Sequence, residues 1–160
     1  MSTMTSEQRK VCHTIMTRVN ENKHGVFFLC GYGGTRKTFI WRVMSIALRS
    51  KGEIVLTVAS SGIATLLIPG GRTTHSRFCI PLNVDEFSTC IIVPKSPLAL
   101  LIQKAKLIIW DETPVMHKHC FEAVDQTLKD ILKSVDEKIN TFPSVQKLLF
   151  LAEILDKFYQ

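Results

Sequence analysis

The sequence predicts an α/β protein built around a mostly parallel β-sheet. Three short apolar runs, at residues 25–31, 53–59 and 106–112, have the length and composition of buried strands. The segments between these runs carry apolar residues at helical spacing. A glycine-rich turn at residues 31–38, GYGGTRKT, joins the first run to a helix. Strands that alternate with helices in this way form βαβ units, whose strands run parallel.

Two helices are expected in the first third of the chain. Residues 5–20 carry apolar side chains at every fourth position, and Ser6 is expected to cap this helix. Residues 37–52 form the second helix, which should end at Gly52 because glycine favours helix ends. The parallel arrangement then places the ends of the strands at one edge of the sheet, where ligands of α/β proteins bind.

The rest of the chain has a less regular pattern. A short capped helix within residues 60–71 breaks at a Pro-Gly-Gly turn, and residues 70–97 form a long excursion rich in turn residues. A short helix is expected at 99–105, and an amphipathic helix at 121–135. A last amphipathic stretch, at 144–159, is also expected to be helical.

Composition limits the function classes. A chain of 160 residues with 46% hydrophobic residues has room for one domain with a real core. The formal charge of +6 favours phosphate-bearing partners such as nucleic acid. The five cysteines are scattered without a C-x-x-C pair, which favours free thiols in a reducing compartment. No apolar stretch approaches the roughly 20 residues that cross a bilayer, so no membrane partner is expected.

The glycine-rich turn is close to the phosphate-binding pattern G-x-x-x-x-G-K-[ST]. Gly31 opens it, and Lys37 and Thr38 close it at the start of a helix. Glycines let the backbone wrap around phosphates, and the helix N-terminus adds N–H donors and positive dipole. The lysine would contact the terminal phosphates of ATP, and the threonine hydroxyl would bind Mg²⁺. Arg36 stands where the pattern has its second glycine.

A second motif, LIIWDE, ends the third apolar run with Asp111 and Glu112. A carboxylate at the end of a strand can hold Mg²⁺, and a second carboxylate beside it can activate the attacking water. Alone, such a pair often forms only a solvated turn. Together with the glycine-rich turn it predicts Mg²⁺-dependent nucleotide chemistry.

Four stretches together resemble the Pif-type DNA helicases, superfamily-one enzymes similar to RecD, in their plant and transposon-associated branch. They are SEQRKV, GVFFLCGYGGTRKTFIWR, VASSGIATLLIPGGRTTHSRFCIPL and LIIWDETPV. The resemblance covers about residues 4–133 and implies an incomplete three-layer, RecA-like P-loop NTPase lobe. It further implies an ATP-dependent 5′–3′ DNA helicase that couples Mg²⁺-dependent ATP hydrolysis to unwinding on single-stranded DNA. It also implies work in DNA repair and recombination, at an intracellular location that is nuclear or mitochondrial.

The resemblance assigns roles to the matching positions. Lys37, Asp111 and Glu112 would be catalytic, and Thr38 and Asp111 would bind the metal ion. His75 and Ser76 would lie near DNA, although an ordinary loop histidine is the alternative for His75. The nucleotide contacts would be Gln8, Gly31, Gly33, Gly34, Thr35, Arg36, Lys37 and Thr38.

Two departures from the family pattern limit this expectation. Arg36 is expected to impair the phosphate loop, because a side chain clashes where the backbone wraps tightly, although its guanidinium could instead contact a phosphate. The resemblance fades after about residue 133. In the family a second lobe supplies an arginine finger, and this lobe is not expected in this chain. The division is therefore a partial lobe at 1–134 and a divergent helical tail at 135–160.

Two other functions stay open from the sequence. One is a non-catalytic lobe that binds nucleotide or DNA, and the other is a small-molecule P-loop kinase. The segment HKHC resembles a metal cluster, but residues two apart on a helix face different sides, so no metal site is expected there.

Overall fold

The computed structural model describes residues 4–23, 25–30, 37–113, 116–136 and 149–154. Five strands form one sheet in the order β1-β5-β4-β2-β3, and each neighbouring pair is parallel. The strands are β1 (Gly25–Cys30), β2 (Ile54–Ala59), β3 (Arg72–Thr73), β4 (Ala105–Asp111) and β5 (Leu149–Ile154). The predicted α/β class with a parallel sheet is confirmed.

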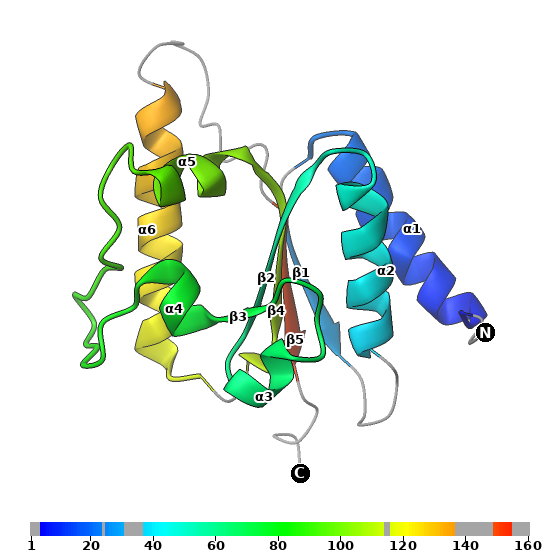
Figure 1. Ribbon diagram of the computed structural model, residues 1–160, viewed down its shortest axis with the longest axis horizontal. Coiled ribbons are helices and arrows are strands. Elements are labelled where there is room, and N and C mark those ends of the chain that lie inside the picture. The colour runs from blue at the N-terminus through cyan, green and yellow to red at the C-terminus, as the bar shows by residue number, and fades with distance from the viewer. Residues whose placement is uncertain (1–3, 24, 31–36, 114–115, 137–148, 155–160) are drawn as a thin grey trace.

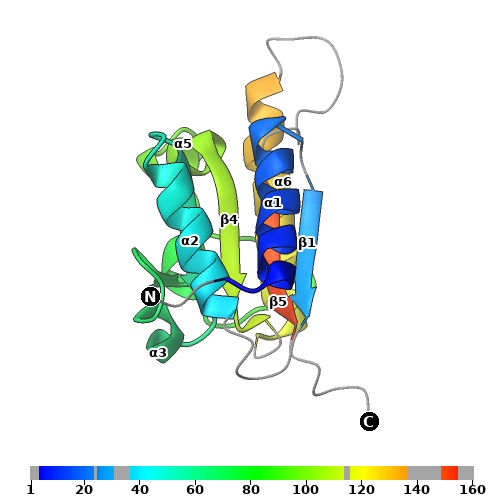
Figure 2. The same cartoon turned by 90° about the vertical axis from the view of Figure 1, so that its right-hand side faces the viewer.

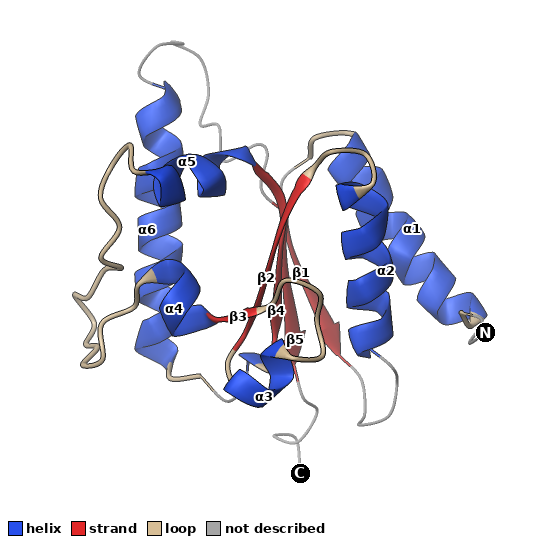
Figure 3. Ribbon diagram, in the orientation of Figure 1, coloured by secondary structure: helices blue, strands red, loops and turns tan. Residues whose placement is uncertain are grey.

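Helices cover both faces of the sheet, which gives three layers (Figures 1 and 3). One face carries α1 (Ser6–Asn20) and α2 (Lys37–Arg49), which lie side by side in Figure 2. The other face carries α4 (Thr74–Phe78), α5 (Pro97–Lys104) and α6 (Lys118–Asp136). The short α3 (Gly62–Thr65) lies at the end of the sheet to which β2 points (Figure 1).

Local sequence explains where α1 begins. Thr5, not the expected Ser6, is the N-cap: its hydroxyl accepts from the Gln8 backbone N–H at 3.2 Å. The Gln8 side chain accepts in return from the Thr5 N–H at 3.0 Å, which completes a capping box. Thr5 takes the cap because its backbone is extended, whereas Ser6 is already the first helical residue.

The central strand β4 divides the core in two. Alternate side chains of a strand point to opposite faces, so Leu107 and Ile109 pack with α1 and α2. Ile108 and Trp110 pack instead with α5 and α6. All four are fully buried, which is why this strand reads as a continuous apolar run.

The Pro-Gly-Gly turn after α3 is fixed by close contacts. The Arg49 guanidinium donates to the Pro69 carbonyl at 2.8 Å and to the Val55 carbonyl at 3.0 Å. A Cβ on Gly71 would lie 2.6 Å from the Thr65 carbonyl oxygen, so only glycine fits there. The excursion that follows, expected to be irregular, contains β3 and α4.

The expected tail helix at 144–159 is wrong for residues 149–154, which form β5. This strand lies between β1 and β4 in the sheet and pairs with both. A short apolar run is compatible with either helix or strand, and here two open strand edges decide in favour of a strand. The division after residue 134 stays a prediction, and α6 runs across it.

Candidate nucleotide site and adjoining cleft

The site lies at the sheet edge where β2 and β4 end. Ala59 and Asp111 are partners in the register of these two strands, so the residues that follow them emerge side by side. The Ser60 N–H donates to the Asp111 carbonyl at 3.2 Å, which extends the ladder by one bond beyond β2. Residues far apart in the sequence therefore meet at one edge, as parallel sheets require.

The structure joins the phosphate-loop helix to the acidic strand end. Lys37 begins α2 and is 8% exposed. Trp41 lies one turn further along the same face, and its indole N–H donates to Asp111 Oδ1 at 3.3 Å. Asp111 is 4% exposed, and its Oδ1 also accepts from the Glu112 N–H at 3.2 Å. The helix that begins at the predicted catalytic lysine is thus tied to the predicted metal carboxylate.

Glu112 is held in an unusual conformation. Its φ of 55° lies in the left-handed region, which is uncommon for a residue other than glycine and often marks functional sites. The Ser61 hydroxyl donates to Glu112 Oε2 at 2.5 Å, within the range of a charge-assisted hydrogen bond. The predicted general base therefore has a defined partner on the neighbouring strand end.

Buried carboxylate and half-buried hydroxyl oxygens fit a Mg²⁺ ion, which prefers oxygen ligands. Asp111 and Thr38, which lies in the first turn of α2, supply these groups. The other predicted loop contacts, Gly31, Gly33, Gly34, Thr35 and Arg36, lie outside the described residues. Gln8 is half-buried within the capping box, and its adenine contact stays a prediction.

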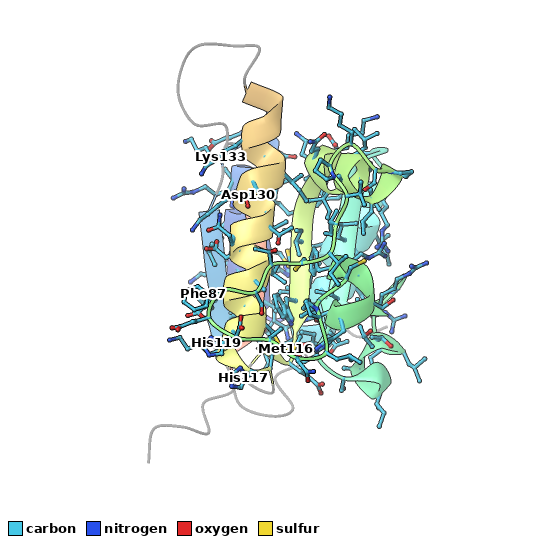
Figure 4. The ribbon with its side chains drawn as sticks, turned by 90° about the vertical axis from the view of Figure 1, so that its left-hand side faces the viewer. Phe87, Met116, His117, His119, Asp130 and Lys133 are labelled. Atoms are coloured by element: carbon cyan, nitrogen blue, oxygen red, sulfur yellow. The ribbon has the colours of Figure 1, made fainter. Side chains whose placement is uncertain are left out.

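An open cleft of about 530 Å³ adjoins the acidic strand end. Its lining includes the predicted DNA residue His75, and also Ser60, Leu82, Met116 and His117. Figure 4 shows Met116 and His117 at the end of α6 nearest this sheet edge. Ser76 is exposed and does not line the cleft; its N–H donates to Thr73 Oγ1 at 3.3 Å.

Within the HKHC segment, His119 and Cys120 have partners or burial that account for them. His119 Nδ1 lies 2.7 Å from Glu122 Oε2, and Cys120 is buried in the core. Among the described residues, no three potential ligands gather as a metal site would require. None of the helices that the structure describes has the length and apolar character needed to span a bilayer.

Sequence reasoning gave no individual role to three residues of the site: Trp41, and Ser60 and Ser61 in the SSGIA segment that the resemblance places near the DNA path. Ser60 and Ser61 could have been found, because they follow a strand and therefore meet the residues that follow β4. Nothing in the sequence indicates that the Trp41 indole reaches Asp111, since the two are 70 positions apart.

Comparisons with known proteins point to one family. A family model described as PIF1-like helicase matches residues 3–147. Over 102 residues, 61% of this chain, the sequence is 31% identical to the ATP-dependent DNA helicase PIF4 of Trypanosoma brucei brucei. The match spans 12% of that relative's length.

Solved Pif1 structures share the fold. Bacteroides Pif1 bound to single-stranded DNA is similar with a TM-score of 0.65 at 24% identity, over 96% of this chain and 32% of that one. Candida albicans Pif1 gives 0.66 at 19% identity, over 95% and 33%. The chain thus spans about a third of these helicases. With the family model matching most of its length, the chain belongs to the PIF1-like helicase family.

Proposed function

We propose that this chain is the ATP-binding and ATP-hydrolysing lobe of an ATP-dependent 5′–3′ DNA helicase. The observation that carries the proposal is the Trp41–Asp111 hydrogen bond, which ties α2, the helix that begins at the predicted phosphate lysine, to the strand end that carries the predicted metal carboxylate. A relative in the same family, Bacteroides Pif1, has been solved in complex with ADP-AlF3 and single-stranded DNA. The family and the geometry therefore support the same reaction.

The residues of the chain divide the work of hydrolysis. Lys37 and the N-terminus of α2 would bind and orient the phosphates of ATP. Thr38 and Asp111 would hold Mg²⁺, which when bound neutralises charge on the phosphate oxygens. Glu112 would accept a proton from the attacking water. The oxygen of this water would then bond to the γ-phosphorus of ATP as the bond from that phosphorus to the ADP oxygen breaks.

The cleft is where we place single-stranded DNA. It combines apolar groups such as Leu82 and Met116 with the imidazoles of His75 and His117, a mixture that suits the faces and edges of unpaired bases. The net charge of +6 adds a general attraction to phosphates. We further propose that the helicase acts in DNA repair and recombination in the nucleus, with the mitochondrion as the alternative.

A non-catalytic lobe is the second candidate, because Arg36 occupies the position of a phosphate-loop glycine. The family assignment favours either of these functions over the small-molecule kinase. Unwinding by the whole protein also needs the parts of the helicases that lie beyond the matched third, so strand separation is a proposal for the longer protein.

Calorimetric titration with Mg-ATP separates these candidates. The titration compares the natural chain with Arg36→Gly, and Lys37→Ala serves as the control that removes the phosphate contact. If the nucleotide site is functional, the first two proteins bind Mg-ATP with similar micromolar affinity, which is a binding free energy on the order of −8 kcal/mol. Lys37→Ala then binds much more weakly. Binding by Arg36→Gly alone would support the non-catalytic lobe, and binding by none of the three would overturn the proposal.

A further inference from the structure

The two residues after β2 make three hydrogen bonds to the last residues of the neighbouring strand end. The Ser60 N–H donates to the Asp111 carbonyl at 3.2 Å, and the Trp110 indole donates to Ser60 Oγ at 3.1 Å. The Ser61 hydroxyl reaches Glu112 Oε2 at 2.5 Å. This Ser60–Ser61 step therefore connects the cleft, which Ser60 lines, with the predicted general base.

The direction of each bond at Ser61 is determined by its partners. A backbone N–H can only donate, so the Ser61 oxygen accepts from the Ala64 N–H at 3.2 Å as the N-cap of α3. The one hydroxyl proton is then available for Glu112, whose carboxylate can only accept when it is ionised. Ser61 thus satisfies α3 and restrains Glu112 with a single side chain.

We propose that Ser61 is a positioning residue that holds the Glu112 carboxylate away from catalysis until single-stranded DNA enters the cleft. The bond from Ser61 fixes the direction of the Glu112 side chain, so the carboxylate cannot turn toward an attacking water while this bond is made. DNA that contacts Ser60 would shift the Ser60–Ser61 step and release Glu112 toward the nucleotide. The inference rests on the proposed function, because it requires Glu112 as the base and DNA in the cleft.

The proposal involves two arrangements of one carboxylate, which is what a coupling between two sites requires. The left-handed backbone at Glu112 supports it, because this conformation needs fixing by its surroundings, and the bond that the Glu112 N–H donates to Asp111 Oδ1 provides part of that fixing. Loss of the Ser61 bond then redirects the side chain while Asp111 continues to hold the backbone.

The test uses the full chain with two variants at Ser61 and one control variant at α5. Ser61→Ala removes both bonds of the hydroxyl, and Ser61→Thr retains a hydroxyl. The matched control is Ser96→Ala, because Ser96 caps α5 through the same kind of bond, from the Ala99 N–H at 3.2 Å, and α5 leads into the start of β4 whereas Glu112 follows its end. An effect of losing a helix cap appears in both alanine variants, whereas an effect on Glu112 appears in Ser61→Ala alone.

The first measurement is the ¹³C carboxylate signal of Glu112, which is assigned by its loss in Glu112→Gln. Without DNA, Ser61→Ala is expected to move this signal, Ser61→Thr to restore it, and Ser96→Ala to leave it in place. An unchanged signal in Ser61→Ala would overturn the role of Ser61. This reading needs neither ATP nor DNA, so it stands apart from the proposed function.

The second measurement adds a thymidine oligonucleotide. On saturation the natural signal should move toward its position in Ser61→Ala, and a signal that stays in place would overturn the coupling. An oligonucleotide that does not bind contradicts the DNA part of the proposed function, and the coupling with it. The role of Ser61 would still be decided by the first measurement.

The third measurement is ATP turnover with and without the oligonucleotide. In Ser61→Ala we expect higher kcat without DNA, an unchanged KM for ATP and a ratio of DNA-stimulated to basal kcat near 1. Ser61→Thr should restore the natural ratio, and Ser96→Ala should retain it. A natural ratio in Ser61→Ala contradicts the proposal. An absence of turnover in the natural chain contradicts its proposed catalysis. The two measurements of the Glu112 ¹³C signal then decide the role of Ser61 and its coupling to DNA.

Discussion

The two faces of the sheet each bury one of the two tryptophans of the chain, and the two indoles serve different parts of the site. Trp41, in the core beneath α1 and α2, donates to the predicted metal carboxylate Asp111. Trp110, in the core beneath α5 and α6, donates to Ser60 at the cleft. One core therefore supports the proposed nucleotide site, and the other supports the proposed connection to DNA.

The largest expected effect is common to both faces. Trp41 and Trp110 are both 0% exposed, and Trp110 also stacks on Phe121 with ring centroids 4.3 Å apart. Truncation of either to alanine should lower the free energy of unfolding by about 3–5 kcal/mol, because a large cavity forms. Denaturant titration measures this loss. A loss below about 1 kcal/mol for either variant would show that its core rearranges, and the two faces would then differ in packing as well as in function.

Replacement by phenylalanine separates the indole N–H from the bulk of the ring. Trp41→Phe leaves the buried Asp111 without one donor and should cost about 1–3 kcal/mol of stability and weaken Mg-ATP binding. Trp110→Phe removes the bond to Ser60 Oγ. Because Ser60 is partly exposed and can bond to water instead, a loss of about 1 kcal/mol in the free energy of unfolding is expected.

The binding assays for the phenylalanine variants sharpen the comparison. We expect Trp41→Phe to reduce Mg-ATP affinity in calorimetry, and Trp110→Phe to reduce the response of Glu112 to the oligonucleotide. The division of labour between the faces would be wrong if both variants changed the same property to the same extent.

The smallest effect concerns thiols on the two faces. Burial raises the pKa of Cys90, in the core beneath α5 and α6, to about 11. Burial also raises the pKa of Cys12, which is only half-buried on α1. At pH 8 a thiol-specific reagent should therefore modify Cys12 well before Cys90, as peptide mass spectrometry can measure. Equal rates would contradict the tight packing of the second core.

The pH dependence of Cys90 has a definite sign. Its pKa rises from an ordinary 9.0 to about 11, so the folded protein keeps a proton that the unfolded chain releases. The free energy of unfolding should accordingly fall as pH rises from about 9 to about 11, and Cys90→Ala should reduce this slope. An identical slope in that variant would show that another group is responsible.

Much of the fold could be predicted because its signals are local. The apolar runs of β1, β2 and β4 and the helical spacing of α2 each lie within a few neighbouring residues. The strand β5 could not be predicted, because its sequence suits a helix equally well and only pairing with β1 and β4 decides its form.

The candidate site follows the same rule. Lys37, Asp111 and Glu112 carry motif signals and could be assigned from sequence, with their roles still to be tested. The Ser61–Glu112 bond joins residues 51 positions apart, so it depends on strand order and register, which no local pattern contains. What tertiary structure adds here is the connection between the two candidate binding places.

The position of β5 has a consequence for biosynthesis. In the described sheet, β1 pairs with β5 alone, although more than a hundred residues separate the two in the chain. During translation, β1 therefore cannot be connected to β4 until residues 149–154 have left the ribosome. A nascent chain that stops before residue 149 would lack this connecting strand, so the strand that precedes the predicted phosphate loop would have no partner in the sheet.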